Sequence, residues 1–135
     1  MAQFLGYLLK CGTNTDNSFI QKDTFESTPN QREEIKAVRD ENTRNLVRIT
    51  ADGMKTAIKF TTMPVNLAGK VAIQNFFKAG IVDSKQRRVR LTYWNDEDNV
   101  YKTSDFYLPD ITFTISTISE DDIQYNPLSI ELIEY

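Results

Sequence analysis

Residues 89–116, VRLTYWNDEDNVYKTSDFYLPDITFTIS, decide the fold class of this chain. Over residues 89–93 apolar side chains alternate with polar ones, the period of two that is typical of a half-buried β-strand. Residues 95–99 are polar and predict a turn, and residues 100–108 would return as the partner strand. The clearest alternation covers residues 111–116, where Ile and Phe exchange with Thr and Ser. We therefore expect a run of antiparallel strands here.

One helix is expected between the strands of the two halves. Asn66 precedes a segment with apolar residues at helical spacing, and its side-chain oxygen can accept an orphan helix N–H. Gly80 is typical of the residue that follows a helix. The pattern predicts a helix over residues 66–79 that packs on a sheet. Alternation resumes over residues 128–133 and predicts a final strand.

The N-terminal half gives weaker patterns. Strands are predicted over residues 4–10, 18–25, 46–51 and 54–62. Asp52-Gly53 lies between the last two and favours a tight hairpin, because this pair tolerates the positive φ angles of a type I′ turn. Residues 26–34 are polar and contain Pro29, which indicates an exposed loop. Residues 35–40 fit either a strand or a short helix.

The order of these elements indicates the fold class. There is no regular strand–helix–strand alternation, which argues against a parallel doubly wound sheet. We expect a mainly β (α+β) fold, an antiparallel β-sandwich or half-open barrel with one flanking α-helix. A chain of 135 residues fits a single domain over residues 1–135, with an extended loop around residues 12–34.

The composition restricts the chemistry. The chain has no histidine and one cysteine, Cys11, which excludes histidine-based catalysis, imidazole metal sites and an internal disulfide. The acidic runs 96–98 and 120–122 lack the spacing of a calcium loop and read as solvated turns. We expect no enzyme activity, no cofactor and no metal. No apolar stretch approaches the ~20 residues of a membrane span, so no membrane partner is expected.

The surface around residues 85–107 has two readings. Lys85, Arg87, Arg88 and Arg90 lie near tyrosines and Trp94 in the sequence. Basic residues beside aromatic ones can bind single-stranded nucleic acid, which would make the chain a small soluble nucleic-acid-binding module. The net charge of −3 argues against a generic duplex binder. In the other reading, the arginines pair with acidic loops of a neighbouring copy.

Several segments are candidates for contacts between subunits. Residues 12–34 are long for a connection in a compact domain, and form either an arm that reaches a neighbour or an ordinary edge hairpin. The first and last strands are candidate sheet edges, which present unpaired backbone groups. The subunit-interface candidates are Phe19, Ile20, Phe25, Arg87, Arg88, Leu128, Ile130 and Leu132.

Four short motifs resemble a known family. They are Arg39-Asp40, RLTYWND (90–96), FYLPD (106–110) and LSIELIE (128–134). In this order, and best over residues 88–135, they resemble a family of small structural tail proteins of long-tailed bacteriophages and prophages.

The resemblance implies a structural virion protein like those of the tail tube or distal tail. It implies a β-sandwich with one flanking helix, and a homohexameric ring of the tube or baseplate that surrounds the DNA channel. Neighbouring tail proteins and the tape-measure protein would be partners, and DNA would pass without specific binding. The protein would lie in the virion tail after assembly in the host cytoplasm. It implies no catalytic residues.

Overall fold

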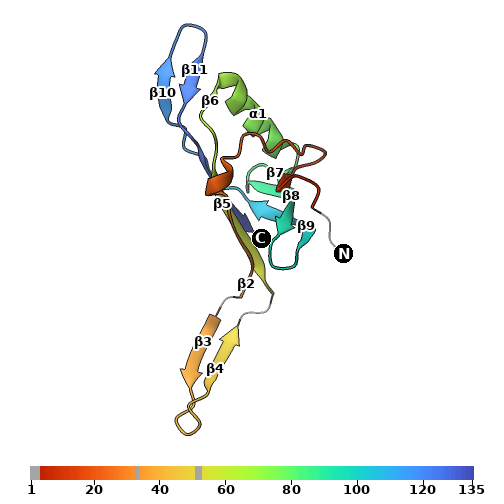
Figure 1. The fold of residues 1–135 in the computed structure, drawn as a ribbon, viewed down its shortest axis with the longest axis vertical. Helices are drawn as coiled ribbons and strands as arrows, with labels where there is room; N and C mark the ends of the chain where they lie inside the picture. Colours follow the sequence, from red (N-terminus) through yellow and green to blue (C-terminus); the bar gives the residue numbers. More distant parts are fainter. Residues whose placement is uncertain (1–3, 33, 51–52) are drawn as a thin grey trace.

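A seven-stranded antiparallel sheet forms the body of the molecule in a computed structural model (Figure 1). The structure describes residues 4–32, 34–50 and 53–135, with the backbone alone over 34–37 and 47–50. The sheet strands are β1 (Leu9–Lys10), β2 (Glu26–Gln31), β5 (Lys55–Thr61), β7 (Ile81–Asp83), β8 (Arg88–Asn95), β9 (Val100–Tyr107) and β12 (Ser129–Glu134). Their order is β1-β8-β9-β12-β5-β2, and β7 also pairs with β8. The predicted fold class, mainly β with antiparallel sheets and one flanking helix, is confirmed.

The β8–β9 hairpin follows the sequence prediction. Its register runs without a break from Arg88 opposite Tyr107 to Asn95 opposite Val100. The side chains of Val89, Leu91, Tyr93 and Asn95 are buried on one face. At the turn, the Asn95 side chain accepts the N–H groups of Glu97 and Asp98, both at 3.0 Å. The polar residues at this turn therefore hold the hairpin closed.

Helix α1 (Leu67–Lys78) covers the buried face of the sheet. The Asn66 side chain accepts the Gly69 N–H at 2.9 Å, so the predicted cap is confirmed. Ile73, Phe76 and Phe77 enter the core. A Cβ on Gly80 would lie 2.3 Å from the Arg90 carbonyl oxygen, so this glycine permits the close approach of the helix end to β8.

The N-terminal half departs from the prediction. Within residues 4–10 only β1 is a strand, and residues 18–25 contain a 3-10 helix, η1 (Lys22–Thr24). The predicted loop 26–34 is instead largely β2. Pro29 is tolerated there because β2 is the last strand of the sheet and has an irregular register between Thr28 and Gln31.

The prediction of one strand over residues 111–116 was wrong. Only β10 (Ile115–Ile118) is a strand, and it pairs with β11 (Ile123–Tyr125), which pairs with β6 (Val65–Asn66). Ile111 packs against the core, and the ring of Phe113 contacts that of Tyr125. The alternation thus continues over an extended segment outside the main sheet in which Ile111 packs on the core while Phe113 and Ile115 are exposed.

A separate two-stranded ribbon projects from the sheet. It consists of β3 (Glu34–Arg39) and β4 (Leu46–Thr50), which we call the arm. The predicted hairpin between 46–51 and 54–62 was wrong, because β4 pairs with β3 while β5 pairs with β2 and β12. Asp52 lies outside the described residues. Among the residues that are described, the single α-helix is too short and too polar to cross a membrane.

Candidate assembly surfaces

The arm is the most prominent surface feature of the molecule. Figure 1 shows it extending from the end of the main sheet, beyond β2. Among the described strands, β3 and β4 pair only with each other. The side chains of Val38 and Leu46 are 47% and 51% exposed. A two-stranded ribbon with apolar side chains in water has little stability by itself, and it gains stability when it packs on a partner.

The sequence of the arm tip defines its turn. The carboxylate of Asp40 accepts the N–H groups of Asn42 at 2.8 Å and Thr43 at 2.9 Å. These bonds lower the pKa of Asp40, Thr43 contributing most, because they favour its charged form. Arg44 adopts a φ of 65°, which completes the reversal of the chain. The Arg39-Asp40 motif thus forms the tip of the arm.

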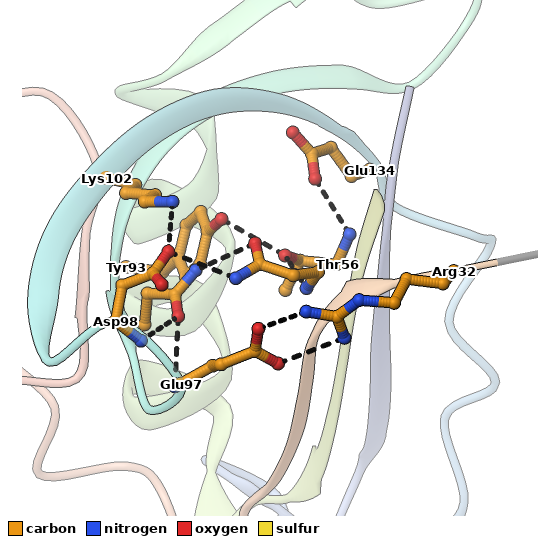
Figure 2. Close-up of polar contacts among 9 residues, drawn as sticks. Arg32, Thr56, Tyr93, Glu97, Asp98, Lys102 and Glu134 are labelled. Atoms are coloured by element: carbon orange, nitrogen blue, oxygen red, sulfur yellow. Dashed lines mark hydrogen bonds and ion pairs between the residues drawn. The ribbon is translucent and has the colours of Figure 1, made fainter. Parts of the chain in front are cut away.

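The root of the arm is tied to the β8–β9 turn, as Figure 2 shows. We call this contact the arm root. Asn30, with a φ of 52°, donates from its side chain to Asp98 at 3.0 Å and accepts from buried Asn95 at 3.2 Å. Arg32 forms a two-pronged ion pair with Glu97. The turn therefore holds the last residues before the arm in place.

Further polar contacts join the arm root to the strands of the main sheet. The Thr56 hydroxyl lies 3.1 Å from the Tyr93 hydroxyl and accepts the Asn30 N–H at 3.2 Å. Glu134 accepts the Thr56 N–H at 2.7 Å and the Ser104 hydroxyl at 2.6 Å. Strands β5, β8, β9 and β12 all contribute. The end of β2, from which the chain leads into the arm, is consequently anchored on the main sheet.

Electrostatics favour the charged state of the acidic residues in this region. The ion pair with Lys102 and then the Asn30 amide lower the pKa of Asp98. The Arg32 guanidinium lowers the pKa of Glu97. The charged groups of these pairs are well exposed to solvent, so their pairing orients the side chains more than it stabilises the fold.

The opposite end of the molecule carries a second projection. Strands β10 and β11 form a hairpin, residues 115–125, which we call the acidic hairpin (Figure 1). Ile118 is 73% exposed, and Glu120 and Asp121 lie in the exposed turn. Asp122 accepts the Leu67 N–H at 3.1 Å, which fixes the hairpin to the start of helix α1.

A pocket of about 330 Å³ opens beside the second half of helix α1. We call it the helix pocket. Its apolar lining includes Ile73, Phe77, Ile81, Leu108, Ile111 and Phe113. Lys78 and Arg87 supply positive charge, and Asp110 supplies negative charge. The Arg87 Nε donates to the Leu108 carbonyl at 3.1 Å, which holds its side chain over the pocket wall.

Half of the predicted interface residues belong to the core instead. Ile20, Leu128, Ile130 and Leu132 are at most 2% exposed. The final strand was taken as an edge, but β12 lies between β9 and β5. These four side chains fill the interior of their own chain, so they offer no surface to a neighbour.

The segment 12–34 is not an arm in this structure. The ring of Phe19 packs against Phe76, and the ring of Phe25 stacks on Phe60 with centroids 5.7 Å apart. The buried Asn17 side chain accepts the Leu9 N–H at 3.0 Å. Of the two alternatives, the arm over residues 12–34 does not form: the end of this segment is β2, the last strand of the main sheet, and the projecting ribbon is β3–β4.

The basic residues of β8 are paired within the chain. The Nε of Arg88 lies 2.7 Å from Asp105, and Arg90 lies 3.2 Å from the same carboxylate. Arg88 also stacks over the ring of Tyr135 at 4.5 Å. Hydrogen bonding to Arg88, followed by the charges of both arginines, lowers the pKa of Asp105. These contacts reduce the positive charge that the surface offers to phosphate.

The aromatic residues of this region are also engaged. Tyr93 is 2% exposed. Trp94 and Tyr101 pack on each other with ring centroids 5.0 Å apart, and Phe4 and Tyr7 cover Tyr101. These rings pack on one another, while Tyr107 is 39% exposed with its ring at an angle to that of Tyr135. The nucleic-acid alternative gains no support from this geometry.

Cys11 is fully buried, and burial raises its pKa to about 12. In the part of the chain that the structure describes, no three acidic or sulfur side chains group as a metal site would require.

The sequence matches the model of DUF6711, a family of unknown function, over residues 1–135. No curated protein and no solved structure shows a significant match to the chain.

Proposed function

The chain belongs to DUF6711, and we propose that it is a structural subunit of a phage tail that assembles into a ring with other copies of itself. The observation that carries the proposal is the arm, a β-ribbon that projects from the sheet and is held at its root by a network of polar contacts.

The physical reason lies in the instability of an isolated ribbon. Two paired strands that carry the exposed Val38 and Leu46 have little stability by themselves. Asn30 and Arg32, the last part of the chain described before the ribbon, are anchored to the β8–β9 turn. A ribbon that pairs with no other described strand of its own chain is suited to packing on a neighbour.

The phage context comes from the resemblance of the sequence motifs to tail proteins. The motif 106–110 starts at the last two residues of β9, and these pair with the end of the motif 128–134 on the adjacent strand β12. The tail position that we propose is the tube or the distal ring near the baseplate. The other partners would be neighbouring tail proteins and the tape-measure protein, and DNA would pass through the channel.

Assembly of the purified chain tests this function. Light scattering and negative-stain imaging of the wild-type chain should show closed rings with a central channel. The matched variant removes the arm by replacing residues 32–54 with an Asn-Gly turn between β2 and β5, whose ends pair at Gln31 and Lys55. This variant should fold and lose the rings.

Two results would refute the proposal. One is a wild-type chain that stays monomeric at high concentration. The other is a variant without the arm that still forms the same rings. Circular dichroism of both proteins should give the same β-rich spectrum, which separates lost assembly from lost folding.

A further inference from the structure

We infer that the acidic hairpin of one copy seats in the helix pocket of the next copy, with Ile118 as the apolar contact. This inference rests on the proposed function, because it specifies a second contact in the same ring. It uses residues that are remote from the arm.

The two surfaces match in polarity. Ile118, the most exposed large apolar side chain among the described residues, projects from the hairpin. The helix pocket has a wall of aliphatic and aromatic side chains and a volume of about 330 Å³. This volume is at the small end of the range for ligand pockets, about 300–1,000 Å³, and suits a protruding side chain.

The two surfaces also match in charge. The hairpin turn carries Glu120 and Asp121, both exposed. The pocket is lined by Lys78 and by Arg87, whose Nε lies 3.7 Å from the carboxylate of Asp110, so Lys78 supplies the excess positive charge of the lining. Lys85 lies in the neighbouring turn between β7 and β8 and adds positive charge. Opposite charges around an apolar contact set its orientation and exclude other registers.

The base of the hairpin lies beside the pocket of its own chain, since the ring of Phe113, part of the pocket lining, contacts that of Tyr125. It is fixed near the start of helix α1 by the Asp122–Leu67 bond and by the pairing of Gln124 with Asn66. Phe77 and Lys78 line the pocket about 15 Å further along the helix, at 1.5 Å per residue. The part of the pocket toward Phe77 and Lys78 is thus open to the hairpin of another copy.

The contact joins two different surfaces of the same chain. Such a head-to-tail contact propagates from copy to copy and closes into a ring when the rotation permits. The hairpin and the arm lie at opposite ends of the molecule (Figure 1), so one copy has room for both contacts.

Cross-linking between two variants, each with one introduced cysteine, tests the inference. Ile118→Cys places a thiol on the hairpin, and Gln74→Cys places one in the pocket. The two proteins are mixed, concentrated to form assemblies and treated with a short bis-maleimide. A covalent dimer should form in the mixture, and neither variant alone should give it. The native Cys11 is buried and should not react.

The matched control pairs Ile118→Cys with Lys59→Cys, an exposed position on the open face of the sheet. Assemblies that form normally without the 118–74 link, or with an equal 118–59 link, overturn the inference and leave the proposed function standing. A wild-type chain that does not assemble overturns both.

A charge exchange gives a second measurement. Glu120→Lys with Asp121→Lys should raise the concentration needed for assembly by roughly fivefold. Lys78→Glu with Lys85→Glu should do the same, and a chain with all four changes should recover. If the chain with all four changes assembles as poorly as the two double variants, the pairing of these charges is contradicted.

Discussion

Replacement of Asn30 by alanine tests whether the arm root is built as the structure indicates. Asn30 combines a φ of 52° with two side-chain hydrogen bonds, to Asp98 and from buried Asn95. Asn30→Ala removes both bonds and leaves alanine, which has a Cβ but no polar side chain, at a positive φ in the left-handed region. Asn30→Gly removes the same bonds but adopts this φ freely.

The expected loss follows from these contacts. In Asn30→Ala, the buried side-chain amide of Asn95 loses the acceptor of one N–H, which costs about 1–3 kcal/mol. Alanine in the left-handed region costs about 1–2 kcal/mol more. The bond to Asp98 adds little, because Asp98 is itself exposed and keeps its ion pair with Lys102. Asn30→Ala should therefore lose about 2–5 kcal/mol of the free energy of unfolding, and Asn30→Gly should lose less.

Urea denaturation monitored by the fluorescence of Trp94, the only tryptophan, gives the measurement. Wild type and both variants should be compared at one concentration below that of assembly, because association would add to apparent stability. A loss below about 0.5 kcal/mol for Asn30→Ala, or a glycine variant less stable than the alanine variant, would refute this account of the arm root.

Three further outcomes can be checked on the purified chain. Gly80→Ala should lower the melting temperature, since its Cβ would lie 2.3 Å from the Arg90 carbonyl oxygen and overpacking costs about 1–3 kcal/mol. Cys11, with a pKa of about 12, should react with Ellman's reagent at pH 8 only after denaturation; rapid reaction of the native chain would show that this site is open. The lowered pKa of Asp105 means that its charged form favours the folded state, a contribution present above the unfolded value of 3.8 and lost as the pH falls through the folded pKa. Asp105→Asn should therefore flatten the fall in stability below pH ~4, and an unchanged acid profile would count against this role.

Local patterns predicted the elements that form between sequence neighbours. The β8–β9 hairpin and the capped helix α1 were both predicted, because their hydrogen bonds join residues close in the chain. Composition also restricted the chemistry, since a chain without histidine has few routes to acid–base catalysis.

Pairing between distant segments could not be predicted in the same way. Strand β12 alternates as any half-buried strand does, and its pattern cannot distinguish a sheet edge from the centre. Its partner β5 lies about seventy residues earlier, with Leu132 opposite Ile58. Leu128, Ile130 and Leu132 were taken for interface residues for this reason. Pro29 led to a different error. Residues 26–34 were predicted to be a loop, although proline is compatible with an edge strand.

The candidate surfaces were the least predictable part of the molecule. The sequence of the arm resembles any short hairpin, and only the structure shows that β3 and β4 leave the main sheet. The exposed Ile118 belongs to a strand that was expected to end at residue 116. Exposure depends on what the rest of the chain covers, and a local pattern does not contain that information.

The arm and the acidic hairpin differ in the forces by which each would hold a neighbour. The arm offers a β-ribbon whose apolar side chains gain from burial, an interaction that salt does not weaken. The hairpin adds Glu120 and Asp121 around one apolar side chain, and exposed charges are screened within about 8–10 Å at physiological salt. A ring built with both contacts would therefore keep its arm contacts at high salt while the hairpin contacts weaken.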